Sequence, residues 1–158
     1  MSDVPPHAGE ACPSRPEITR TLARGVQRLL LDRNYAPILE LTLGNGRRAD
    51  VAALGPRGDI VIVETKSGVE DYLDDFKWPA YRDYCDAFYF AVTEEFPHVM
   101  IPEDAGLIIA DGFGGEIIRE APRLPLAGAR RKAITLAFAR VAASRLFGAP
   151  LPEVLTPR

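Results

Sequence analysis

The chain has 158 residues, which at roughly 100 to 200 residues per domain allows a single domain. Its 47% hydrophobic and 26% charged residues are ordinary for a soluble globular protein and exclude collagen-like, low-complexity and largely disordered chains. The formal net charge of -3 excludes a uniformly basic coat, but it allows a basic stripe beside an acidic site. No apolar run approaches the ~20 residues of a membrane helix, and the start lacks the layout of a signal peptide. We therefore expect a cytoplasmic protein with no membrane partner.

Proline and glycine without periodicity predict flexible tails at residues 1–13 and 149–158, around one domain at residues 14–148. The capping box that begins at Ser14 and includes Glu17 opens an amphipathic helix, with apolar side chains at helical spacing as far as Leu30.

Three strands follow this helix. Alternating residues at 38–43 and 47–54 flank Gly44-Asn45-Gly46, which predicts a hairpin. The β-branched run at 60–66 is typical of a strand buried on both faces, yet it ends in Glu64 and Lys66. Such a local conflict tends to lie at a functional site.

The second half of the chain alternates helices and strands. A capping box at residues 67–70 predicts a helix with an apolar face as far as Ala80, kinked at Pro79. Strands are predicted at 87–92, 106–110 and 116–119, and a last helix at 127–147. The pattern indicates the α/β class, with one mixed β-sheet flanked by helices.

The register of the three strands brings acidic residues together. If the loop at 55–59 leaves Leu54 opposite Ile60, antiparallel pairing places Asp50 opposite Glu64. The turn at 44–46 likewise places Glu40 opposite Asp50. Lys66 follows Glu64 by two residues and shares its face. We expect the opposite face to be apolar, with Leu39, Leu41, Leu43, Ala49, Val51, Ala53, Val61, Val63 and Thr65.

Carboxylates that face each other repel unless a cation or a proton neutralises them. Mg²⁺ or Mn²⁺ is the simplest remedy, and Asp50, Glu64 and the backbone carbonyl of Thr65 are suitable oxygen ligands. A bound metal lowers the pKa of a water, and Lys66 is placed to orient or deprotonate that water or to stabilise a charged phosphorus centre. The pattern predicts hydrolysis of a phosphodiester.

An acidic residue upstream of Glu-x-Lys on a core strand resembles the PD-(D/E)XK nuclease superfamily, whose restriction-endonuclease-like core has the order αβββαβ. Here the core carries an extra β-hairpin and a C-terminal helix. Over about residues 15–145 the chain more closely resembles the MmcB family of bacterial DNA repair proteins, through Arg48-Ala49-Asp50, Ile62-Val63-Glu64-Thr65-Lys66-Ser67, Lys77-Trp78-Pro79, Tyr81, Tyr84-Cys85-Asp86 and residues 88–92. The resemblance implies a protein of DNA repair or damage tolerance that binds DNA and acts as a metal-dependent endonuclease.

The resemblance also suggests auxiliary residues. Ala49 stands where the superfamily motif has proline, a change that alters no ligand. RecB-like relatives add a glutamine and a tyrosine from the next helix, where this chain has Lys77 and Tyr81 at helical spacing. Glu40 and Glu17 compete for an extra acidic position, and the strand register favours Glu40.

Each assignment has a simpler alternative. Glu64 and Lys66 are also consistent with a surface ion pair. Glu40 is also consistent with a solvated strand position. Lys77 also suits a helix surface, and Tyr81 also suits the edge of a core. The acidic run Asp71, Asp74 and Asp75 is interpreted as a solvated helix face. Trp78 and Tyr81 fit core packing better than base stacking. The basic residues are equally consistent with DNA contacts and with solubility: Arg20, Arg24, Arg28 and Arg48, and the group Arg130, Arg131 and Lys132.

Three functions compete on these observations. The first is a metal-dependent DNA endonuclease that uses Asp50, Glu64 and Lys66. The second is a DNA-binding module with weak or no catalysis that recruits other repair or translesion proteins. The third is a scaffold protein whose acidic row binds metal only for stability. The intact acidic and lysine residues favour the enzyme, and the sequence leaves the form of the DNA open. The C-terminal helix suits a homodimer interface and packing on the sheet equally well.

Overall fold

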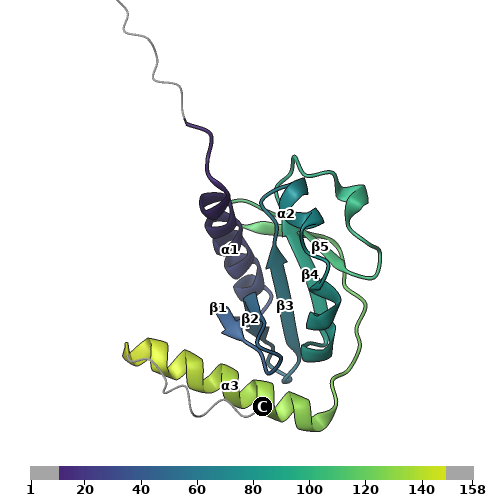
Figure 1. Cartoon of the computed structure of the whole chain (residues 1–158). Coiled ribbons are helices and arrows are strands. Elements are labelled where there is room, and N and C mark those ends of the chain that lie inside the picture. Colours follow the sequence, from purple (N-terminus) through teal and green to yellow (C-terminus); the bar gives the residue numbers. More distant parts are fainter. Residues whose placement is uncertain (1–10, 149–158) are drawn as a thin grey trace, which may run out of the picture.

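The structure is a computed structural model in which residues 11–148 are described (Figure 1). Apart from residues 11–13, both predicted tails lie outside that range. One mixed six-stranded sheet has its strands in chain order. Its elements are α1 (Arg15–Asp32), β1 (Ala36–Thr42), β2 (Arg48–Leu54), β3 (Ile60–Thr65), α2 (Val69–Leu73), the 3₁₀ helix η1 (Trp78–Tyr84), β4 (Ala87–Val92), the 3₁₀ helix η2 (His98–Met100), β5 (Gly106–Ala110), β6 (Gly115–Arg119) and α3 (Gly128–Phe147). The predicted α/β class and the order αβββαβ are confirmed.

The central strands β3 and β4 run parallel, and β5 continues parallel to β4. The strands at the two sides of the sheet pair antiparallel. Every residue of β3 and β4 is buried, because helices cover both faces of the sheet. None of the helices within residues 11–148 is both long and apolar enough to cross a membrane.

Helix α1 covers one face of the sheet. The capping box predicted at Ser14 and Glu17 is present at its start. Leu22, Val26 and Leu30 are buried in a cluster with the side chains that β2, β3 and β4 direct toward this face. Gly25 is required where the helix crosses the turn after β5, because a Cβ there would lie 1.9 Å from the Asp111 carbonyl oxygen. A larger residue would separate helix and turn.

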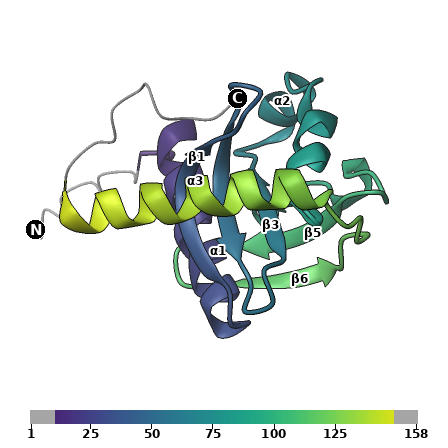
Figure 2. The ribbon, with the colours of Figure 1, turned by 90° about the horizontal axis from the view of Figure 1, so that it is seen from below.

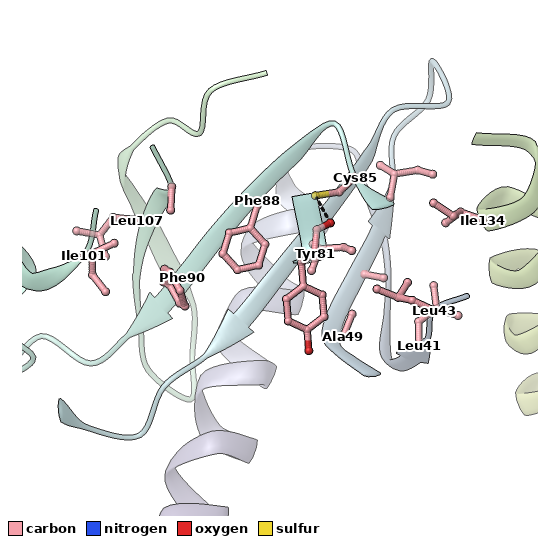
Figure 3. Close-up of a cluster of buried hydrophobic side chains, with 14 of the residues drawn as sticks. Leu41, Leu43, Ala49, Tyr81, Cys85, Phe88, Phe90, Ile101, Leu107 and Ile134 are labelled. Atoms are coloured by element: carbon pink, nitrogen blue, oxygen red, sulfur yellow. Dashed lines mark hydrogen bonds between the residues drawn. The ribbon is translucent and has the colours of Figure 1, made fainter. Parts of the chain in front are cut away.

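The opposite face holds a second cluster, formed with η1 and α3 (Figure 3). Tyr81 and Trp78 of η1 stack on Phe88 of β4, with ring centroids 5.8 and 5.4 Å apart. Ile134 and Phe138 are the buried residues of α3, which crosses the strands on this side (Figure 2). The packing of Trp78 and Tyr81 confirms the core interpretation of both aromatic residues.

The predicted strand register is confirmed wherever the strands pair. Leu54 lies opposite Ile60, and Leu39 and Leu41 lie opposite Val51 and Ala49. The pairing of β1 with β2 skips Glu40, whose φ of 54° is unusual for a residue with a side chain.

The prediction of one continuous apolar face is wrong for the hairpin. Leu39 packs in the α1 cluster, whereas Leu41 and Leu43 pack in the η1 and α3 cluster. On the facing strand β2, Val51 likewise packs in the α1 cluster, whereas Ala49 packs in the η1 and α3 cluster. On β1 the change coincides with the left-handed conformation of Glu40, which lies between Leu39 and Leu41.

The single kinked helix predicted from residue 67 is also wrong. The structure has the short α2, a loop and η1 instead. Gly68 at the N-cap of α2 has no side chain to cap it, and the Ser67 hydroxyl donates to Asp71 rather than serving as the cap. Pro79 lies in the first turn of η1, where its missing N–H costs nothing, so it begins a helical segment instead of bending one.

Candidate functional site

Two carboxylates on adjacent strands form the centre of the site. Asp50 lies on β2, and Glu64 lies near the end of β3. The Asp50 backbone N–H donates to Glu64 Oε1 at 3.0 Å. In return, the Thr65 backbone N–H and hydroxyl donate to Asp50 Oδ2 at 2.8 and 3.0 Å. These bonds fix both side chains against the backbone of the neighbouring strand.

Burial disfavours the charge on both acids, and repulsion by Asp50 adds to this effect at Glu64. Burial, followed by the charge of Asp50, raises the pKa of Glu64 to about 8. Burial also raises the pKa of Asp50, against the hydrogen bonds from Thr65 that lower it. Lys66 lowers the pKa of both acids, which shows that its charge acts on the pair. A cation bound between the acids would remove this conflict.

Lys66 is buried, at 7% exposure, directly after β3. Its Nζ lies 2.8 Å from Asp75 Oδ2 in an ion pair whose two side chains are 8% and 15% exposed. Asp75 Oδ1 also accepts the Lys77 backbone N–H at 3.1 Å. The loop after α2 therefore holds the lysine ammonium beside the two carboxylates.

Asp75 is the site residue that the sequence analysis missed. The run containing Asp71, Asp74 and Asp75 was interpreted as a solvated helix face, but Asp71 and Asp75 are only partly exposed and both accept hydrogen bonds. The sequence feature that could have identified Asp75 is the lysine Lys66. A lysine buried at the end of a core strand needs an anionic partner, and this run supplies the next acids along the chain.

Tyr81 and Lys77 do not share one helix face as predicted, because Lys77 is the N-cap of η1 and Tyr81 lies within it. Tyr81 is buried, and its hydroxyl donates to the Arg48 carbonyl oxygen at 3.0 Å, two residues from Asp50. Burial and the charge of Glu64 raise the pKa of Tyr81 to about 12, so the hydroxyl remains a donor. Lys77 is exposed at the rim of the site.

Glu40 and Glu17 lie outside the group that the structure brings together. The Glu40 side chain is 61% exposed and lies 3.9 Å from Arg48 in a weak ion pair. The irregular backbone at Glu40 removes it from the ladder that was expected to aim it at Asp50. Glu17 instead accepts from the Ser14 backbone N–H at 2.6 Å at the start of α1.

The basic residues fall into two groups. Arg20, Arg24 and Arg28 of α1 are exposed, and so is Arg48 of β2. In the second group, Arg131 pairs with Asp86 at 2.6 Å, and Arg130 donates to the Asp83 carbonyl oxygen at 3.1 Å. Arg130 and Arg131 therefore attach α3 to the sheet, whereas the first group, Arg20, Arg24, Arg28 and Arg48, remains accessible to a ligand.

The acids fit a two-carboxylate metal site. Among residues 11–148, no three His, Cys, Asp or Glu side chains are clustered so as to hold a metal. Mg²⁺, however, commonly takes one or two carboxylates and fills its other positions with waters. Asp50 Oδ1 and Glu64 Oε2 accept no hydrogen bond from the described part of the chain, and neither is fully enclosed there. With the Thr65 carbonyl, the donor set is all oxygen, as Mg²⁺ and Mn²⁺ prefer.

Two cavities lie near η1 and the loop that precedes it. One of about 420 Å³ reaches Lys66 and is bounded by the loop that follows α2. A larger groove of about 1160 Å³ lies between α3, η1 and the turn at 44–46, and neither acid nor Lys66 lines it. Of Asp50, Glu64 and Lys66, only Lys66 lines the smaller cavity.

Comparisons with known proteins place this chain in a family. A protein of unknown function from Silicibacter pomeroyi has a similar solved structure, with a TM-score of 0.81 and 40% identity over 85% of this chain and 97% of that one. No curated protein matches the chain. Residues 8–153 match the family described as DNA repair protein MmcB-like. The match covers nearly the whole chain, so the chain belongs to the MmcB-like family of DNA repair proteins.

Proposed function

We propose that this DNA repair protein is a metal-dependent DNA endonuclease of the PD-(D/E)XK type. The observation that carries the proposal is the cross-bonded pair Asp50 and Glu64 with the buried Lys66 beside it. Two buried acids whose pKa values are raised are costly to keep charged in a folded protein, which favours a role that uses their charge. The membership of the chain in a DNA repair family supports DNA as the substrate.

Each residue has a role in hydrolysis of a phosphodiester bond. Asp50, Glu64 and the Thr65 carbonyl would hold Mg²⁺ or Mn²⁺, which supplies charge neutralisation and an acidified water when bound. Lys66 Nζ orients the attacking water or neutralises the charge that builds on the phosphate oxygens. Asp75 keeps that ammonium in place through the 2.8 Å ion pair. Tyr81 supports the strand that carries Asp50.

The test is a cleavage assay on purified protein with supercoiled, circular single-stranded and branched DNA, in Mn²⁺, in Mg²⁺ and in EDTA. We expect metal-dependent cleavage that Asp50→Asn and Lys66→Ala reduce by at least about 100-fold, because each removes a group that acts on the reacting phosphate. Glu40→Gln is the matched control, since Glu40 is an exposed acid on the neighbouring strand. Wild-type activity in the Asp50 and Lys66 variants would refute the assignment.

The second candidate is a DNA-binding module with little or no catalysis. The observation that favours it is the absence of a third clustered acid within residues 11–148. This protein would bind DNA with the usual dependence on salt and would bring other repair proteins to the site. Salt-sensitive binding without cleavage of any substrate, in Mn²⁺ or Mg²⁺, would support this function over the nuclease.

A further inference from the structure

Phe76 is an apolar side chain in an unusual position. It lies in the loop between α2 and η1 and is 86% exposed, although the neighbouring Trp78 packs into the core. It also forms part of the wall of the 420 Å³ cavity that reaches Lys66. The full lining of this cavity is Arg47, Lys66, Asp71, Asp74, Asp75, Phe76 and Lys77. An exposed aromatic ring thus lines a cavity that also reaches Lys66.

Three acidic and three basic side chains line the cavity. Asp75 is paired with Lys66, and Asp71 accepts the Ser67 backbone N–H and hydroxyl at 2.8 and 3.0 Å. Of the remaining lining residues, Asp74 is exposed and opposes Lys77 and Arg47.

The two cations are also accessible. The Arg47 guanidinium lies 5.4 Å from the centre of the Tyr81 ring, and neither Arg47 nor Lys77 forms a salt bridge with any residue from 11 to 148. The formal charge of the lining is therefore zero, but Lys77 and Arg47 are two cations beside the exposed ring that a phosphate can contact.

From these observations we propose that the cavity binds an unpaired nucleotide of single-stranded DNA, with its base stacked on Phe76 and its phosphates next to Lys77 and Arg47. A base inside a duplex has both faces covered by its neighbours, so a side chain that projects from a loop can stack only on a base that is already unpaired or has left the stack. The proposal rests on the proposed function for its choice of DNA, and it names the strand form that the site recognises.

The test measures binding by fluorescence anisotropy in EDTA, so that cleavage does not interfere. The probes are a labelled single-stranded oligonucleotide and the duplex of the same sequence. We expect Phe76→Ala to weaken binding of the single strand by about tenfold, to leave duplex binding unchanged, and Phe76→Trp to restore the affinity. Phe113→Ala is the matched control, because Phe113 is 83% exposed in the turn after β5 and does not line the cavity.

The contribution of charge is measured separately. Lys77→Gln is expected to lower the slope of log affinity against log salt by about one for the single strand, as expected for one lost phosphate contact. Lys132→Gln, an exposed lysine of α3 outside the cavity, is expected to leave the slope unchanged. Equal losses in the Phe76 and Phe113 alanine variants, or equal losses for single strand and duplex, would overturn the proposal.

The binding assay is independent of cleavage. A protein that binds single strands through Phe76 but cleaves nothing would refute the nuclease and keep the present inference. A protein that cleaves DNA through Lys66, but whose Phe76→Ala variant binds single strands as the wild type does, would keep the nuclease and refute this inference.

Discussion

At the scale of single residues, the charged end of β3 is where local sequence preference and structure disagree. A buried β-branched strand has Glu64 near its end and Lys66 directly after it, and this conflict is visible in the sequence alone. The strand register then predicted Asp50 as the partner of Glu64, and the hydrogen bonds between them are consistent with it. Asp75 was not predicted as a partner of Lys66, because it lies in a loop. The residue pattern of that segment predicts a helix instead.

The raised pKa of Glu64 has a consequence for stability. The group has a pKa near 4.5 when unfolded and about 8 in the folded protein, so the folded state binds the proton more tightly. Stability in EDTA therefore falls as the pH rises from 4.5 to 8, by something on the order of a few kcal/mol. Glu64→Gln removes the charge while keeping an oxygen for the Asp50 N–H. We expect the variant to be more stable than the wild type at pH 9 and to lose most of this slope, as measured by urea unfolding at several pH values.

Glu40→Gln provides the comparison for this measurement, because Glu40 is an exposed glutamate on the adjacent strand. Its pH profile should follow that of the wild type. If the profile of Glu64→Gln also ran parallel to the wild type from pH 5 to 9, the folded protein would hold Glu64 in its ordinary charged state, and the repulsion argued for the acid pair would be absent.

At the scale of elements, sequence periodicity was informative wherever one face of an element is buried continuously. It predicted α1, the hairpin, the central strands and α3, since apolar side chains recur along each. It failed from residue 67 to 84, where aromatic spacing imitates a helix. There the rings of Tyr72, Trp78 and Tyr81 pack on Phe88 and Phe90 from two short segments, α2 and η1, rather than from one helix. Such packing depends on tertiary contacts that a local pattern does not contain.

One buried carboxylate, Asp86, forms the ion pair that helps to attach α3. Asp86 accepts two hydrogen bonds from Arg131 at 2.6 and 2.7 Å and others from the backbone N–H groups of Ile60 and Leu126. Despite burial, which raises it, these bonds lower the pKa of Asp86 to about 2. The stabilisation is thus present above pH 3.8 and is lost as the pH falls toward 2.

We expect Asp86→Ala to destabilise the protein by about 3 kcal/mol at pH 7, because it leaves Arg131 and two backbone donors without their acceptor. Urea unfolding measures the loss, and hydrogen exchange along α3 shows whether that helix is released first. Asp83→Ala is the control, since Asp83 is an exposed acid at the end of η1. A loss below about 1 kcal/mol in Asp86→Ala would mean that Ile134 and Phe138 hold α3 without the ion pair.

At the scale of the whole molecule, the acid pair lies on two strands, β2 and β3, that contribute side chains to both hydrophobic clusters. The side chains that alternate along β3 enter the α1 cluster from one face and the η1 and α3 cluster from the other. Asp50 and Glu64 lie at the end of these buried runs, and Tyr81 ties the second cluster to β2 at Arg48. The geometry of the site therefore depends on both clusters being formed, so unfolding of either cluster separates the acids.

This dependence predicts that metal binding stabilises the entire fold. The unfolded chain does not hold Asp50 and Glu64 together, so a metal that binds only the native state adds about 2.7 kcal/mol at a free concentration of 100 times its Kd. For a chain of this length we expect Mn²⁺ to raise the Tm by roughly 5 to 10 °C in a thermal scan, and EDTA to reverse the rise. Asp50→Asn should show no rise, whereas Glu40→Gln should respond as the wild type does. An equal rise in Asp50→Asn would place the bound metal elsewhere, and the absence of any rise in the wild type would favour a DNA-binding module over a nuclease.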